Sequence, residues 1–352
     1  MRRSGKRTVV ALAVIAGIAA VMVNACRVDP EILPVLSKED VKFYVPEGFP
    51  QPVYDFANNA VTPEGFALGR RLFYDPILSQ DNTISCGFCH QQTNAFANAN
   101  HQFSHGINGQ FGTRNAPTLF NLAWNNSFMW DGGINHIESQ PLGPITNPVE
   151  MGETMSNVIA KLNASTTYRN DFKTAFGDDS ITTQRVCRAL AQFMGVMISA
   201  DSKYDRYMKG TATFTAAEEH GLALFRSKCV SCHTEPLFTD RQYHNNGLPI
   251  DNTINDGGRI RITHDPADSL KFKTPSLRNV AVSGPYMHDG RFLTLAECLD
   301  HYSSGIFVSP TLDPQLTTGI PLTAQEKSDL IAFLATLTDM TFIQDTRFKE
   351  AH

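Results

Sequence analysis

The chain has 352 residues, of which 18% are charged, and its formal net charge is -5. This weakly acidic balance, without a long basic run, excludes a dedicated nucleic-acid partner. The length suits two domains, and the 24 glycines and 19 prolines favour helices joined by long irregular segments.

The first 26 residues have the organisation of a signal peptide. Basic residues 1–7 lead into an apolar run over residues 8–23, shorter than the about 20 residues that comfortably span a bilayer. Val23-Asn24-Ala25-Cys26 is similar to a bacterial lipobox, so we expect a lipid on Cys26. A plain cleaved signal and an uncleaved anchor are the alternatives. All three place the folded part on the periplasmic or cell-envelope side of a bacterial membrane, and the lipid is the only membrane contact expected.

Residues 27–60 are rich in Pro and Val and are predicted to form an extended arm. A first unit over residues 61–205 then begins with Thr62-Pro63-Glu64, a helix start with Pro at the first helical position. It ends with a helix predicted over residues 185–198. Between them, an insertion over residues 91–163 is rich in Asn, Gly and Pro, and we expect functional chemistry there.

A second unit over residues 206–352 repeats this order. It begins with a capping box, Thr215 with Glu218, and closes with a helix predicted over residues 330–337 after a second capping box, Thr323 with Glu326. The repeat indicates a weak internal duplication.

Each unit carries one Cys-x-x-Cys-His run, Cys86-Gly87-Phe88-Cys89-His90 and Cys229-Val230-Ser231-Cys232-His233. Two thiols one helical turn apart can form thioethers to the vinyl groups of a haem, and the next histidine then reaches the iron. A zinc site, a redox pair and a disulfide are the alternatives, but none requires that histidine twice. We therefore predict a mainly α protein of two c-type cytochrome domains with long irregular loops, each holding one covalent haem.

Two further cysteines, Cys187 and Cys298, lie in apolar helix-like contexts. They are predicted to be buried thiols rather than a disulfide.

Six other segments carry a family resemblance. They are Arg114-Asn115-Ala116-Pro117-Thr118, Met129-Trp130-Asp131-Gly132, Gln140-Pro141-Leu142-Gly143-Pro144, Asn147-Pro148-Val149-Glu150-Met151, Thr274-Pro275-Ser276-Leu277-Arg278-Asn279-Val280 and Pro285-Tyr286-Met287-His288-Asp289-Gly290. With the two haem motifs, from about residue 62 to 337, they resemble the bacterial di-haem cytochrome c peroxidases and the related enzyme MauG. The resemblance implies a peroxidatic haem on His90 and a higher-potential, electron-storing haem on His233.

The resemblance also implies roles in the insertion. Glu150 matches the catalytic glutamate, Gln140 an amide that hydrogen-bonds peroxide, and Pro144 a residue that restricts the pocket. Trp130 matches a tryptophan between the two haems. Without the family, Glu150 could cap a helix and Trp130 could be a core aromatic.

A calcium site and a haem contact follow from the same resemblance. Asn115, Ser283 and Pro285 match the ligands of a Ca²⁺ ion between the domains, and neutral oxygen donors suit calcium. Asn115 could instead only form a turn. His288 is expected to contact a haem propionate.

The distal iron ligands divide the family. His105 matches a histidine that caps the peroxidatic iron until the other haem is reduced, with His101 as a competitor. Tyr302 stands where MauG has its tyrosine ligand of the second haem, with His301 and Met287 as rivals.

The leading functional prediction is a peroxidase that takes electrons from a small c-type cytochrome or copper protein. The alternatives are a MauG-like oxidase of a protein partner, and a non-catalytic electron carrier. Tyr302 favours the MauG-like oxidase, but Ser227, two residues before the second Cys-x-x-Cys-His run, stands where MauG has a tryptophan that withdraws electrons from its protein substrate. Because relatives are commonly dimers, a homodimer is expected.

Overall fold

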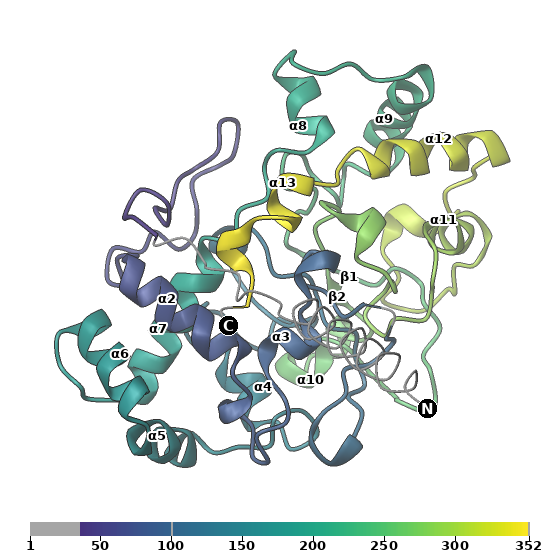
Figure 1. Cartoon of the computed structure of the whole chain (residues 1–352). Helices are drawn as coiled ribbons and strands as arrows, with labels where there is room; N and C mark the ends of the chain where they lie inside the picture. The colour runs from purple at the N-terminus through teal and green to yellow at the C-terminus, as the bar shows by residue number, and fades with distance from the viewer. Residues whose placement is uncertain (1–35, 100, 351–352) are drawn as a thin grey trace, which may run out of the picture. The chain divides into compact units, whose positions relative to one another are not determined.

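The two units predicted from the sequence, called the first and second half below, are each organised around a pair of crossing helices (Figure 1). In this computed structural model, α2 (Pro63–Tyr74) packs against α7 (Thr183–Gly195), and α9 (Ala216–Lys228) packs against α12 (Ala324–Ala335). The structure describes residues 36–99 and 101–350. The expected signal peptide, Cys26 and the first part of the expected arm therefore lie outside the described residues.

The starts of these helices follow their local sequence. Thr62 accepts a hydrogen bond from the backbone N–H of Gly65, and Pro63 occupies the first turn. Both predicted capping boxes are confirmed, since Thr215 and Thr323 each exchange two hydrogen bonds with the glutamate three residues later. The predicted closing helices correspond to α7 and α12, which begin two and six residues earlier than predicted.

A glycine stands at each helix crossing. A Cβ atom on Gly69 would lie 2.0 Å from the carbonyl oxygen of Ala189, and one on Gly221 would lie 2.0 Å from that of Asp329. Any larger residue would push the helices apart, so these two glycines set the closest approach in each half.

The other helices are short, and irregular segments join them. The remaining α-helices are α3 (Cys86–Cys89), α4 (Leu142–Thr146), α5 (Met155–Ala164), α6 (Thr166–Phe176), α8 (Lys203–Met208), α10 (Ile260–Thr263), α11 (Leu295–Ser304) and α13 (Met340–Ile343). The 3-10 helices are η1 (Pro76–Leu78), η2 (Gln92–Asn94), η3 (Ile107–Gly109), η4 (Leu122–Trp124), η5 (Pro266–Asp268), η6 (Val280–Val282), η7 (Pro314–Leu316) and η8 (Thr346–Phe348). Strands β1 (Tyr243–His244) and β2 (Phe272–Lys273) pair antiparallel, with Tyr243 opposite Lys273. Within the described ranges, no helix is long and apolar enough to cross a membrane.

Each half also contains a loop, and the two loops have the same conformation. Residues 128–134 and 286–292 each close with an antiparallel bridge and each contain a Met-x-Asp-Gly sequence. Met129 and Met287 both have positive φ angles, 66° and 72°, and so do the glycines three residues later. Trp130 and His288 therefore occupy equivalent places in the two loops.

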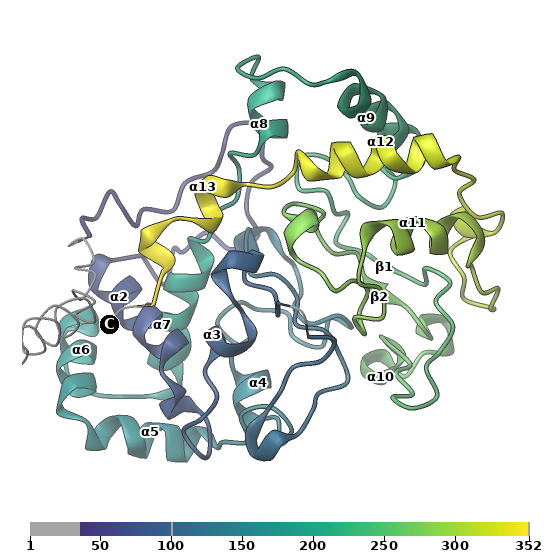
Figure 2. The same ribbon diagram turned by 45° about the vertical axis from the view of Figure 1, so that its right-hand side comes forward.

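The apolar core is divided into two clusters. One surrounds α2 and α7, and the other surrounds α9 and α12. The C-terminal tail joins the first cluster through Phe342, Ile343 and Phe348, although it follows α12 in the chain. Figure 2 shows this yellow segment running from α12 through α13 toward α2 and α7. The domain limits drawn from the sequence stay a prediction, and the tail crosses them.

Residues 36–60 contain no helix or strand, but their side chains pack against the first half. The indole N–H of Trp124 donates to the carbonyl oxygen of Pro50 at 2.7 Å, and Phe43 contacts the rings of Trp124 and Phe56. Val41 and Phe56 are buried. This part of the expected arm is therefore anchored to the folded unit.

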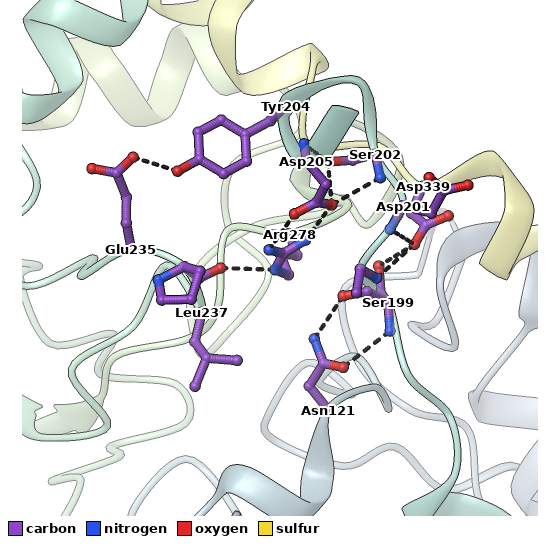
Figure 3. A network of polar contacts seen from close by, with 12 residues as sticks. Asn121, Ser199, Asp201, Ser202, Tyr204, Asp205, Glu235, Leu237, Arg278 and Asp339 are labelled. Carbon is purple, nitrogen blue, oxygen red and sulfur yellow. Dashed lines mark hydrogen bonds and ion pairs between the residues drawn. The ribbon is translucent and has the colours of Figure 1, made fainter. Parts of the chain in front are cut away.

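A buried polar network connects the halves (Figure 3). Arg278 is fully buried and donates two hydrogen bonds of 2.8 Å to the carboxylate of Asp205. Beside this pair, Asn121 exchanges two 3.0 Å bonds with the backbone of Ser199, whose hydroxyl donates to Asp339 at 3.1 Å. The network fixes the segment that links α7 to α8.

Candidate functional site

The first Cys-x-x-Cys-His run lines a cavity of about 380 Å³. Ser85 caps α3, and the backbone N–H of His90 donates to the carbonyl of Cys86 at 2.9 Å, which closes one helical turn between the two thiols. The Nδ1 atom of His90 lies 2.8 Å from the carbonyl oxygen of Phe96. Nδ1 therefore carries the proton and leaves the Nε2 lone pair for a metal. Burial lowers the pKa of His90, which keeps the ring neutral.

The second run repeats this geometry at a cavity of about 600 Å³. Cys229 follows the last turn of α9, and the N–H of His233 donates to its carbonyl at 3.0 Å. The Nδ1 atom of His233 lies 3.1 Å from the carbonyl of Phe238, and burial lowers the pKa of this histidine too.

Both cavities fit a c-type haem by the chemistry of their donors. Each presents two cysteines and one neutral histidine with a free Nε2, and apolar side chains such as Phe73, Leu190, Leu299 and Leu334 complete the walls. This combination suits a covalently attached macrocycle that is flat, largely apolar and carries a metal at its centre.

Glu150, Gln140 and Pro144 line the first cavity together with His90. In the described part of the chain, Glu150 Oε2 is buried and has no hydrogen-bond partner. Burial raises the pKa of Glu150, and the Asn147 side chain and the charge of Arg114 oppose that rise only in part. A carboxyl group with a raised pKa and a free oxygen is suited to take up and release a proton.

His105 lines the same cavity from a tight loop. Its ring lies between those of His101 and Phe111, at centroid distances of 4.7 and 4.4 Å. A Cβ atom on the next residue, Gly106, would lie 2.0 Å from the carbonyl oxygen of Val149. The backbone of the His105 loop therefore presses on the segment that carries Glu150.

Trp130 lines both cavities. Its indole N–H donates to the carbonyl of Asn115 at 2.8 Å, which fixes the ring in the partition between the two haem motifs. Asn115 also lines both cavities.

The far side of the second cavity presents two of the three rival ligands. Among the described residues that line it, Tyr302 and Met287 are present and His301 is not. The Asn246 side chain donates to the Tyr302 hydroxyl at 3.4 Å and to the Met287 sulfur at 3.5 Å. His301 Nε2 instead lies 3.0 Å from the Asn246 carbonyl oxygen. Burial raises the pKa of Tyr302 to about 12, so ionisation of its hydroxyl requires a nearby cation.

The residues expected at a calcium ion and a propionate also line the second cavity. Asn115, Ser283, Pro285 and His288 are all in its wall. The Asn115 amide donates to the carbonyls of His101 and Gln102 at 3.2 Å, so its side-chain oxygen is the atom left for a cation. His288 stacks on Phe272 at 3.6 Å, and burial lowers its pKa to about 4.

Sequence reasoning missed several polar residues of these cavities, among them Asn246 and Lys273. Asn246 lies in no recognisable motif. Lys273 directly precedes the Thr274–Val280 segment, and its position in both cavity walls depends on contacts with residues more than a hundred positions earlier.

Comparison with known proteins agrees with this geometry. Residues 63–213 match the sequence model of the family described as di-haem cytochrome c peroxidase. The chain is 36% identical to the methylamine utilization protein MauG of Methylorubrum extorquens over 308 residues, covering 84% of this chain and 83% of that protein. It is 34% identical to the cytochrome c551 peroxidase of Nitrosomonas europaea, covering 79% and 82% of the two chains. A crystal structure of a MauG-like protein associated with microbial copper homeostasis superposes with a TM-score of 0.78 at 35% identity, over 87% of this chain and 98% of that one. The chain therefore belongs to the di-haem cytochrome c peroxidase family of oxidoreductases, which includes the MauG proteins.

Proposed function

We propose that this protein is a peroxidase that converts hydrogen peroxide, two electrons and two protons into two waters. The observation that carries this proposal is Glu150, a buried carboxyl group whose Oε2 has no partner among the described residues and which lines the cavity of His90. An acid with an unpartnered oxygen, in the same cavity as a metal-binding histidine, suits proton transfer.

Two haem c groups, as the family carries, would be covalently held. Cys86 and Cys89 would bind the first, with His90 on its iron, and Cys229, Cys232 and His233 would bind the second. When bound, haem supplies the electron-transfer chemistry and a metal position for peroxide.

The residues opposite His90 supply the proton chemistry. Glu150 Oε2 would take a proton from one oxygen of hydrogen peroxide and give it to the other, which leaves as the first water. The two electrons and two further protons of the reaction would convert the remaining oxygen into the second water. The Gln140 amide hydrogen-bonds the peroxide and holds it in line with Glu150. Pro144 offers no side-chain donor and restricts the volume, so that peroxide is bound in one orientation.

His105 is the residue that we propose as a switchable ligand of the first haem. Its loop contacts the segment that carries Glu150, and this contact leaves no room for a side chain at Gly106. A movement of the loop would therefore change both the access of peroxide to the cavity and the position of Glu150.

Electrons are proposed to enter at the second haem and pass Trp130. The indole lies in the wall of both cavities, so it shortens the gap between the two groups. The donor is a small c-type cytochrome or copper protein. Tyr302 is proposed as the distal ligand of the second haem, because it lines that cavity while His301 bonds to a backbone carbonyl.

Calcium is proposed at Asn115, Ser283 and Pro285, and His288 is proposed to contact a haem propionate. We further propose a location on the periplasmic or cell-envelope side of a bacterial membrane, a lipid anchor on Cys26, and a homodimer. The two haem domains are proposed to meet near residues 202–210.

Peroxide consumption by the haem-loaded protein tests the function. The donor is a reduced cytochrome c, and the assay is run before and after reduction of the second haem alone. Fast turnover is expected only after that reduction, because His105 otherwise blocks the first haem. Equal turnover in both states would refute the gate, and no turnover in either state would refute the peroxidase.

A MauG-like oxidase of a protein partner is the second candidate, favoured by Tyr302 in the wall of the second cavity. A long-lived oxidised state with slow peroxide turnover would identify it. Ser227, which stands in place of the MauG tryptophan that withdraws electrons from its protein substrate, argues against it.

A further inference from the structure

The partition between the two cavities is built from a reciprocal pair of backbone hydrogen bonds. The N–H of Asn115 donates to the carbonyl of His288 at 2.8 Å, and the N–H of Lys273 donates to the carbonyl of Trp130 at 2.7 Å. Asn115 and Lys273 each stand two residues before a proline, Pro117 and Pro275. Each half therefore inserts one equivalent residue against the Met-x-Asp-Gly loop of the other half.

The two equivalent side chains differ in charge. Asn115 is neutral and bonds to two loop carbonyls, whereas Lys273 carries an ammonium group. Lys273 Nζ donates to one acceptor, the carbonyl of Ser127 at 2.7 Å, and lies 5.9 Å from the centre of the Phe128 ring. Across residues 36–99 and 101–350, no carboxylate forms an ion pair with it.

Holding this ammonium group in the protein without a counter-ion costs free energy. It has three N–H groups and one protein acceptor, and burial lowers its pKa to about 8. A charge that is removed from water is stabilised where another group supplies the opposite charge.

The other cations near the first cavity have partners. Arg114 binds Asp131 at 2.6 Å and Asp256 at 2.6 Å, and Arg261 lies 3.5 Å from Asp256. Their charges are matched within the protein. Lys273 alone among these three has an unmatched charge to offer to a bound anion.

The position of Lys273 Nζ indicates which of the two cavities the ammonium group faces. Lys273 lines both, but Phe128, which Nζ approaches, lines only the first. A haem in that cavity would bring two propionate carboxylates, which are anions that could pair with this ammonium group.

We propose that Lys273 is the counter-ion of a propionate of the haem on His90, and that its charge raises the reduction potential of that haem. The inference rests on the proposed function only in requiring that this haem be bound. The second half of the chain would thus supply a charge that tunes the first haem. Without Lys273, the unneutralised propionate would favour the ferric iron.

Potentiometric titration of the fully haem-loaded protein, followed by absorption spectroscopy that resolves the two haems, is the test. Three variants at this position are compared. Lys273→Met removes the charge in an apolar shape, Lys273→Gln removes it but keeps a donor for the Ser127 carbonyl, and Lys273→Arg keeps the charge.

Lys271→Met is the matched control, because Lys271 lies two residues away, pairs with Asp268 at 3.4 Å and is not among the residues that line either cavity. It changes the net charge of the protein by the same amount. We expect the potential of the His90 haem to fall in Lys273→Met and Lys273→Gln, to be kept in Lys273→Arg, and to be unchanged in Lys271→Met. The His233 haem should shift less.

Equal potentials in wild type, Lys273→Gln and Lys273→Met, at two haems per chain, would overturn the inference. So would an equal fall in Lys271→Met, since the effect would then come from net charge. If Lys273→Met does not fold, Lys273→Gln decides the question alone. Peroxide turnover is measured separately, so normal turnover without a shift refutes only the role of Lys273, and a shift without turnover refutes only the peroxidase.

Discussion

Replacement of Glu150 by Gln separates the catalytic and structural roles of that residue. The amide has the same shape as the carboxyl group but cannot carry a proton between the two peroxide oxygens. General acid–base catalysis contributes about 10²–10⁴-fold, so Glu150→Gln should slow the peroxide step by that factor, or about 2.7–5.5 kcal/mol of activation free energy. Stopped-flow mixing of the activated protein with peroxide measures this step directly.

The same substitution should stabilise the fold. Burial raises the pKa of Glu150 in the folded protein, so between the unfolded and folded pKa values the folded state binds more protons. Stability therefore falls as the pH rises through that window, and the penalty persists above it. Glu150→Gln removes this penalty at neutral pH and should raise Tm there. The difference from wild type should vanish below pH about 4, where the carboxyl is protonated in both states.

Glu153→Gln is the matched control three residues away. Burial alone would raise the pKa of Glu153, but the 2.7 Å ion pair with Lys161 and the Thr154 N–H outweigh it and lower that pKa. Its contribution to stability is thus present above the unfolded pKa and is lost as the pH falls through the folded value. Lys161 keeps its 2.6 Å bond to the Ser79 carbonyl, so we expect a loss of about 1–3 kcal/mol rather than more. Peroxide turnover should be unchanged.

The two glutamates should therefore show opposite results, with activity lost at Glu150 and stability lost at Glu153. A Glu150→Gln protein that reacts with peroxide at the wild-type rate would refute the assignment of the acid. A Glu150→Gln protein with lower Tm at neutral pH would refute the claim that Oε2 has no structural partner.

Three further predictions concern the second cavity and the fold. Tyr302→Phe should change the absorption spectrum of the His233 haem and raise its potential, whereas Met287→Leu should do neither; the reverse result would make Met287 the ligand. Asp205→Ala should cost about 3–5 kcal/mol in urea unfolding, since it leaves the buried Arg278 guanidinium uncompensated, and a cost below about 1 kcal/mol would contradict that account. Gly221→Ala would stabilise an exposed helix by about 1 kcal/mol, but here it should lower Tm, because the new Cβ lies 2.0 Å from the Asp329 carbonyl; a rise in Tm would show that the helices separate easily.

The features that the sequence predicted well are local. Thr215 and Thr323 cap their helices with glutamates three residues away, and each Cys-x-x-Cys-His run spans a single turn. Such features depend on neighbours along the chain, so short-range chemistry determines them. The placement of Glu150 and Trp130 at the cavities rested on motif resemblance, which carries three-dimensional information that spacing alone lacks.

Features formed by distant segments could not be predicted. Nothing in the sequence around Phe348 indicates that it packs in the core of the first half, and Lys273 reads locally as an ordinary surface lysine. The proposal of Tyr302 rather than His301 as a ligand depends on the contact between His301 and the Asn246 carbonyl, and Asn246 lies 55 positions before His301. One signal was available, because the repeated Met-x-Asp-Gly sequences are visible in the chain and mark the equivalent loops.

The return of the C-terminal tail to the first half has a consequence for biogenesis. Arg70 and Tyr74 on α2 donate to the carbonyls of Arg347 and Phe348, about 275 residues away. The core beside the first haem motif is therefore complete only after these distant residues have packed on α2. The second half can fold around its own helix pair before those contacts form, while the packing of the first core cluster, which Cys86 adjoins, is still incomplete.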